Sequence, residues 1–147
     1  MDVEFSLNSS GWLAVFQLGV IKLLQDTVDL SSARIVGTSA GAAAGAVICC
    51  NFPAEVAAEA MCQQEILSRC DFTQMVPLMK EGLERLAPKG AAEACDGRLG
   101  IVCTEVQVFP PKISTVEFKT YASRKDLVDL LGASSHIPVL GGFYPHV

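Results

Sequence analysis

The segment Gly37–Gly41, which reads G-T-S-A-G, constrains the fold of this chain more than any other feature. An apolar run, 33–36, comes directly before it, and the small residues 42–46 follow. This order predicts a strand, a tight turn and a helix, with Ser39 at the turn. Because a side chain at position 37 or 41 would collide with the sharply turned backbone or the neighbouring strand, glycine is expected at both places.

Two roles are open to Ser39. It could be an activated nucleophile, since free N–H groups and the dipole at a helix start favour a developing negative charge. It could instead be a helix cap, a role that serine fills well. The flanking strand and helix favour the nucleophile. The spacing of Gly37, Gly41 and Gly45 could also mark a membrane helix pair. However, the apolar stretch 35–50 is shorter than the ~20 residues that a span needs.

Composition narrows the class of protein. A chain of 147 residues suits a single domain, 1–147, and a net charge of −5 argues against a nucleic-acid partner. The acidic N-terminus, 1–4, lacks the positive segment of a secretory signal, so a cytoplasmic location is expected. Six cysteines without a C-x-x-C pair predict reduced thiols. With only two histidines in the chain, we expect no metal site and no cofactor.

Hydrophobic periodicity predicts an α/β domain. Strands are expected at 3–7, 34–36, 99–108 and 113–118, and helices at 12–25, 40–50, 53–70, 76–86 and 123–131. Residues 132–147 are rich in Gly and Pro and are predicted to be loop. The helix 12–25 is apolar on nearly all sides and is expected to be buried. The amphipathic helix 76–86 is a candidate lid or interface element.

Several motifs occur in a set order: a strand, a glycine turn, a buried helix, a second strand, the G-T-S-A-G turn, several helices, the segment 97–101 and the segment 135–139. In this the chain resembles the patatin-like phospholipase family, most closely its adipose triglyceride lipase and adiponutrin branch, over residues 5–145. The resemblance implies a three-layer α/β/α domain. It also implies a serine lipid acyl hydrolase of the triacylglycerol lipase or phospholipase type, which acts in lipid degradation through a Ser-Asp dyad without a cofactor.

The resemblance assigns roles to particular positions. Ser39 would be the nucleophile, and the elbow around it would comprise Gly37, Thr38, Ala40 and Gly41. In the turn 9–14, the backbone N–H groups of Ser10, Gly11 and Trp12 would bind the oxyanion. Expected partners are a triacylglycerol or phospholipid ester and, optionally, the surface of a lipid droplet or membrane.

The sequence departs from the family pattern in two places. Ser9 and Ala14 stand where the family has glycine, and side chains there can crowd the oxyanion donors. The family's catalytic aspartate lies in a D-G-G or D-G-A turn after the segment matched by 137–139, whereas this sequence ends at Val147. The domain is therefore expected to be C-terminally incomplete. Asp96-Gly97 is predicted to be a turn before the strand 99–108 and receives no catalytic role.

Two other functions remain open from the residues alone. An α/β-hydrolase triad would use Ser39, either Asp126 or Asp129, and His146, in the order that fold requires. A catalytically impaired lipid-binding or regulatory relative would fit the two missing glycines and the missing aspartate.

Overall fold

The computed structural model describes residues 3–63 and 74–136 of the chain. Its strands are β1 (Glu4–Leu7), β2 (Arg34–Thr38), β3 (Leu99–Gln107) and β4 (Lys112–Phe118). Its helices are the 3-10 turn η1 (Gly11–Leu13), α1 (Ala14–Thr27), α2 (Ala40–Cys49), α3 (Ala54–Met61), α5 (Met75–Leu86), α6 (Ala91–Cys95) and α7 (Arg124–Ser135). The predicted α/β class is confirmed.

The four strands form one sheet in the order β1-β2-β3-β4. The first three strands are parallel, and β4 returns antiparallel to β3 as a hairpin. Parallel strands end at the same edge of a sheet, so the loops that follow β1 and β2 lie together at the carboxyl edge. This edge carries both the turn 9–14 and Ser39.

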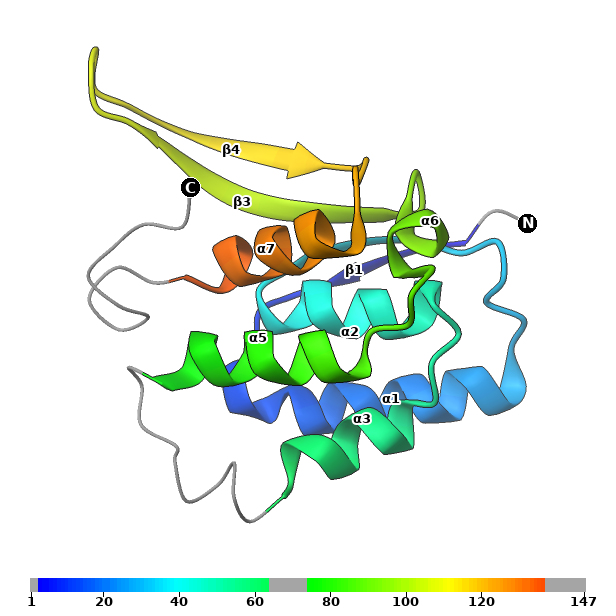
Figure 1. Cartoon of the computed structure of the whole chain (residues 1–147). Coiled ribbons are helices and arrows are strands. Elements are labelled where there is room, and N and C mark those ends of the chain that lie inside the picture. Colours follow the sequence, from blue (N-terminus) through cyan, green and yellow to red (C-terminus); the bar gives the residue numbers. More distant parts are fainter. Residues whose placement is uncertain (1–2, 64–73, 137–147) are drawn as a thin grey trace.

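The described helices gather against one face of the sheet (Figure 1). The strands alternate accordingly: Ile35, Leu99 and Ile101 point into the helices and are fully buried, whereas Glu4 and Arg34 are exposed. Of the three layers that the resemblance implies, the described residues therefore form the sheet and the helical layer on one side.

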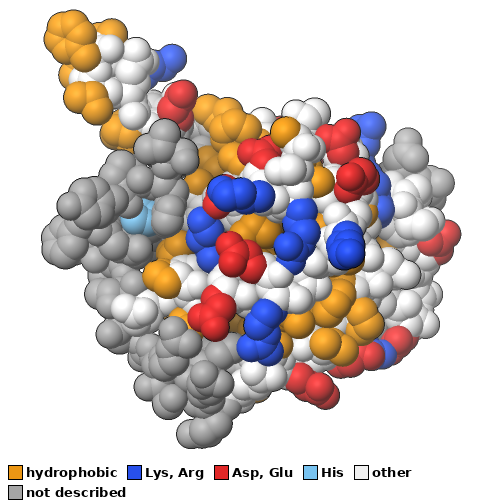
Figure 2. Space-filling view, viewed as in Figure 1, with side chains coloured by type: hydrophobic (Ala, Val, Ile, Leu, Met, Phe, Trp, Pro, Cys, Tyr) orange, Lys and Arg blue, Asp and Glu red, His pale blue; other side chains and the backbone are white. Residues whose placement is uncertain are grey.

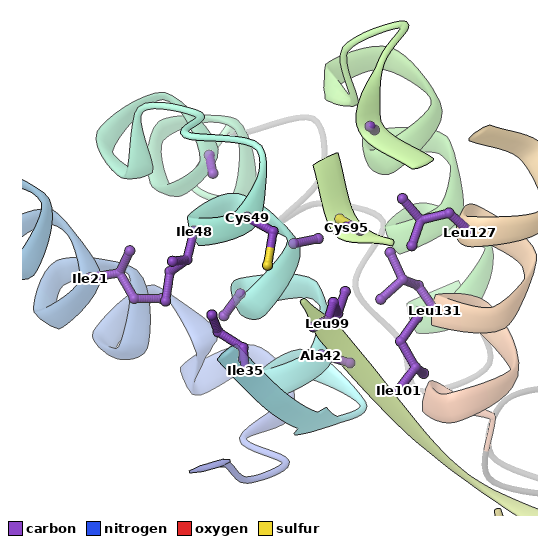
Figure 3. Packing of buried hydrophobic residues seen from close by; sticks show 14 of the residues in the cluster. Ile21, Ile35, Ala42, Ile48, Cys49, Cys95, Leu99, Ile101, Leu127 and Leu131 are labelled. Atoms are coloured by element: carbon purple, nitrogen blue, oxygen red, sulfur yellow. The ribbon is translucent and has the colours of Figure 1, made fainter. Parts of the chain in front are cut away.

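The core lies between the sheet and helices α2 and α7 (Figure 3). The small residues of α2 allow it to approach the sheet closely. A Cβ at Gly45 would lie 2.7 Å from Ile35 Cγ2 and 2.8 Å from Leu99 Cδ1. Packing against the sheet, rather than a membrane, thus accounts for the glycine spacing. Among the described residues, no helix combines the length and apolar character needed to cross a membrane.

Arg98 lies at the edge of the sheet that is opposite to the edge with Ser39, and it connects three backbone segments there. Its guanidinium donates hydrogen bonds to the carbonyl oxygens of Leu30 (2.9 Å), Ala33 (3.3 Å) and Cys49 (3.0 Å). Gly97 precedes it at φ +67°, and the Asp96 carboxylate accepts a hydrogen bond from Tyr121 N (3.2 Å). Asp96-Gly97 is therefore a structural turn, as predicted.

Several expectations about the helices were wrong. The helix that begins after Pro53 ends at Met61, well before the expected residue 70. Gly132–Ser135 continue α7 rather than forming loop, and the short helix α6 was not predicted. Helix α1 is not buried on all sides, because Leu13 just before it and Phe16 and Leu23 within it are 74%, 76% and 63% exposed.

Candidate active site

Ser39 lies between the end of β2 and the start of α2, in a backbone conformation that serine rarely adopts. Its φ is 54° and its ψ is −128°. Its carbonyl oxygen accepts hydrogen bonds from Ala42 N (2.9 Å) and Ala43 N (3.2 Å), but its side chain makes no capping hydrogen bond. The cap explanation is therefore wrong. A strained, non-capping serine at a strand-to-helix turn is the arrangement expected of a nucleophile.

The two glycines of the motif are required by backbone contacts. A Cβ at Gly37 would lie 2.7 Å from Ala42 N and Cα, on the other side of the turn. A Cβ at Gly41 would lie 2.1 Å from Leu7 O and 2.6 Å from Asn8 O, at the end of β1. Gly41 thus lets the first turn of α2 rest against the backbone that leads into the turn 9–14. The motif brings the two predicted parts of the site together.

The turn after β1 forms one wall of the site. Gly11 has φ +52°, in the left-handed region that favours glycine, and Leu13 N donates to Ser10 O (3.0 Å). Gly11, Trp12 and Ser39 line the same cavity. Ser10 Oγ is buried and has no hydrogen-bond partner among the residues that the structure describes.

Ser134, near the end of α7, supports the turn and was not identified from the sequence. Its hydroxyl accepts a hydrogen bond from Ser39 N (2.8 Å) and donates to Val102 O in β3 (2.6 Å). It therefore ties the elbow to both the sheet and α7. No local pattern could reveal this contact, because Ser134 lies 95 residues from Ser39 in the sequence.

An apolar cavity of about 170 Å³ opens beside Ser39. Its floor comes from α2, through Ala40, Ala43 and Val47, and helix α5 forms the opposite wall, through Met79 and Leu83. The helix predicted as a lid or interface element is therefore a wall of the cavity in this structure. Alanine and leucine side chains offer no hydrogen bonds, so the cavity suits a hydrocarbon chain.

The aspartates of α7 are engaged away from Ser39. Asp129 forms ion pairs with Lys80 (2.7 Å) and Lys125 (2.5 Å), which hold the pKa of its carboxyl below the usual value. Asp126 accepts a hydrogen bond from Ala122 N (3.0 Å) at the start of the helix. The triad alternative also needs His146, which lies outside the described residues. Because both aspartates make these other contacts, neither is assigned a catalytic role with Ser39.

Three thiols lie together behind the cavity. Cys50 lines the cavity, and its Sγ lies 3.9 Å from that of Cys95, which is fully buried. Hydrogen bonding from Cys95 lowers the pKa values of Cys49 and Cys50, and the same contacts raise that of Cys95. The five described cysteines form no disulfide. Over residues 3–63 and 74–136, no cluster of side chains suits a metal ion.

No family model matches the chain, and comparison with known proteins shows a distant relationship. The sequence is similar to omega-hydroxyceramide transacylase of Mus musculus, with 27% identity over 152 residues. The match covers 97% of this chain and 25% of that protein, so the chain spans about a quarter of the relative's length. This similarity connects the chain to a protein named for acyl transfer. Membership of the patatin-like family remains a prediction.

Replacing Ser134 tests its support of the elbow. In Ser134→Ala the Ser39 N–H loses its partner, so the turn should shift, and a displacement of about 1 Å at a reacting atom can cost ~10²-fold in rate. We expect labelling of Ser39 by a fluorophosphonate to slow by about tenfold or more, with recovery in Ser134→Thr.

A second variant of α7 separates positioning from stability. Ser123 caps the start of α7, where its hydroxyl accepts a hydrogen bond from Asp126 N (3.1 Å), and Ser123→Ala should cost about 1 kcal/mol. That variant should destabilise the same helix yet label at the wild-type rate. Equal slowing in both alanine variants would mean that Ser134 acts only through general stability.

Proposed function

We propose that this chain is a lipid acyl hydrolase domain, with Ser39 as the nucleophile that forms an acyl-enzyme. The proposal is carried by the geometry of Ser39, which is strained, does not cap its helix, and lies at the wall of an apolar cavity. Similarity to a protein named as a transacylase supports acyl chemistry.

The proposed reaction has two halves. Ser39 Oγ attacks the ester carbonyl carbon and gives its proton to a base, and the carbonyl oxygen becomes an oxyanion. When the C–O bond to the alcohol breaks, the alcohol takes the proton and the acyl group stays on Ser39. Water then attacks the acyl-enzyme and releases the fatty acid. By the resemblance, the base is an aspartate in a D-G-G or D-G-A turn.

The donors proposed for the oxyanion come from two backbone segments. The first N–H groups of α2, at Ala40 and Gly41, have no carbonyl partner one turn back within the helix. The N–H groups of Ser10, Gly11 and Trp12 belong to the turn packed beside them. One such donor is typically worth about 3–4 kcal/mol in the barrier, so the two segments together supply the electrostatic part of catalysis.

The proposed acyl site is the apolar cavity, and a variant that fills it should change chain-length preference. Ala43 is half-buried, lies one turn after Ser39 and lines the cavity. Ala43→Leu should lower kcat/KM for the 4-nitrophenyl ester of a long fatty acid by about tenfold or more, because each methylene in an apolar pocket is worth ~1–3 kcal/mol. The butyrate ester should be affected little.

The control for that variant is Ala122→Leu, on an exposed loop outside the cavity. It should leave the ratio of long-chain to short-chain activity unchanged. If Ala43→Leu leaves the ratio of long-chain to short-chain activity unaltered, the cavity does not bind the acyl chain.

A second candidate function is transfer of the acyl group to a lipid hydroxyl instead of water. The name of the mouse relative favours it, and so does the apolar lining, which disfavours water near the acyl-enzyme. Product analysis with and without a long-chain alcohol decides between the two. An acylated alcohol formed at the expense of free fatty acid would identify a transacylase.

Fatty-acid binding tests the alternative that the chain is a catalytically impaired, lipid-binding relative. Trp12 is the only tryptophan of the chain and lines the cavity, so its fluorescence should report fatty-acid binding directly. A protein that binds fatty acid but never forms a covalent adduct at Ser39 would be a binding relative and not an enzyme.

A further inference from the structure

The β3–β4 hairpin ends in a group of exposed apolar side chains. Val106, Val108, Phe109 and Ile113, which we call the hairpin tip, are 65%, 83%, 90% and 76% exposed. The hairpin projects from the body of the molecule (Figure 1), and Figure 2 shows hydrophobic atoms gathered at its end. Large apolar side chains grouped at a projection are costly in water and mark a contact site.

The hairpin tip extends from the same edge of the sheet as Ser39. In the parallel pairing of β2 and β3, Thr38 is opposite Val102, and Ser39 comes directly after Thr38. Strand β3 continues beyond this point to Gln107, which at about 3.3 Å per residue carries it roughly 17 Å past the edge. The apolar group and the candidate nucleophile therefore face the same side of the molecule.

A second apolar pair lies at this edge. Leu13 and Phe16 are 74% and 76% exposed. Leu13 is the last residue of η1, and Phe16 lies in the first turn of α1, next to the turn that lines the cavity with Ser39. They come from the β1 side of the sheet, whereas the hairpin tip comes from the opposite side. Two separate groups of exposed apolar side chains at one edge suit a broad, deformable apolar partner.

The low charge of the hairpin tip favours a lipid surface as that partner. Lys112 is the only charged residue in the segment 106–113, and it is exposed. A lysine beside inserted apolar side chains can reach the phosphates while its stem stays in the interface. A protein interface, in contrast, usually involves ~20–30 residues on each side, and the hairpin tip offers four apolar side chains on a thin ribbon.

We propose that the hairpin tip inserts into the interface of a phospholipid bilayer, with Leu13 and Phe16 as a second contact. In this orientation the edge that carries Ser39 faces the membrane. The inference rests on the proposed function in one respect only: it names the lipid surface from which that site would draw its ester.

Vesicle flotation tests the proposal. We expect the wild-type chain to float with phosphatidylcholine vesicles, and the double variant Val108→Ser/Phe109→Ser to lose at least tenfold in the lipid-to-water partition. The matched control is Val28→Ser, because Val28 is 45% exposed but lies at the far end of α1, and it should float like wild type. Lys112→Ser should weaken binding more when phosphatidylserine is included.

A fluorescence measurement tests whether the hairpin tip itself contacts the lipid. In Phe109→Trp, the added emission, after subtraction of the wild-type signal from Trp12, should shift to the blue with vesicles and be quenched by lipids brominated on the acyl chains. Wild-type protein that stays with the water phase, or a double variant that floats as well as wild type, would overturn the proposal. So would loss of self-association in the double variant without any vesicle binding, which would make the hairpin tip a contact between copies.

Membrane docking and catalysis at Ser39 can be measured separately. Hydrolysis of water-soluble 4-nitrophenyl butyrate and labelling by a fluorophosphonate need no membrane. If the double variant keeps both reactions and loses vesicle binding, the hairpin tip serves docking alone.

Discussion

Ser39→Ala should abolish covalent labelling by a fluorophosphonate and lower ester cleavage by about 10³-fold or more. Wild-type Ser39 Oγ should attack the phosphorus and expel fluoride, which leaves a stable adduct whose added mass locates the serine. The reason is the turn at Ser39, which holds the hydroxyl at the cavity wall without a capping bond. Intact-mass spectrometry and peptide mapping provide the measurement.

The control for this result is a serine outside the cavity. Ser31 is exposed and lies in the loop before β2, so Ser31→Ala should label like wild type. Equal labelling of wild type and Ser39→Ala would refute the nucleophile. A wild-type chain that does not label, yet binds fatty acid at Trp12, would instead support the impaired relative.

Gly41→Ala should destabilise the fold by about 3 kcal/mol or more. The new Cβ would lie 2.1 Å from Leu7 O, and because both the first turn of α2 and the end of β1 are backbone, neither can move aside cheaply. The variant should also separate Ser39 from the turn 9–14. Urea denaturation measures the loss, as a lower midpoint at an unchanged slope.

A matched glycine isolates the steric effect. Gly19 lies within α1, is exposed, and has no atom within 4 Å of where its Cβ would be. Gly19→Ala should therefore stabilise the chain by about 0.5–1 kcal/mol, the ordinary gain of alanine over glycine in a helix. If Gly41→Ala behaved like Gly19→Ala, the close contact between α2 and β1 would not exist.

Local sequence patterns predicted the parts of the fold that depend on near neighbours. The alternation in 3–7 and the apolar run 33–36 gave strands close to their observed bounds, and Ser123 with Asp126 marked the start of α7. The glycines of G-T-S-A-G were interpreted correctly, because the collision at position 37 arises within the turn itself. The five residues of α6 are too few to show a helical period, so that helix was missed.

The sequence by itself determined the strand-turn-helix around Ser39 and the α/β order of elements, since these follow from backbone geometry and from periodicity within a few residues. Only the tertiary structure decided what meets Ser39 and what stays in water. Ser134 reaches Ser39 N from a helix 95 residues away, and apolar Phe16 and Phe109 remain exposed. A hydrophobic residue in a sequence shows a tendency to be buried, but the packing of distant elements determines whether anything covers it.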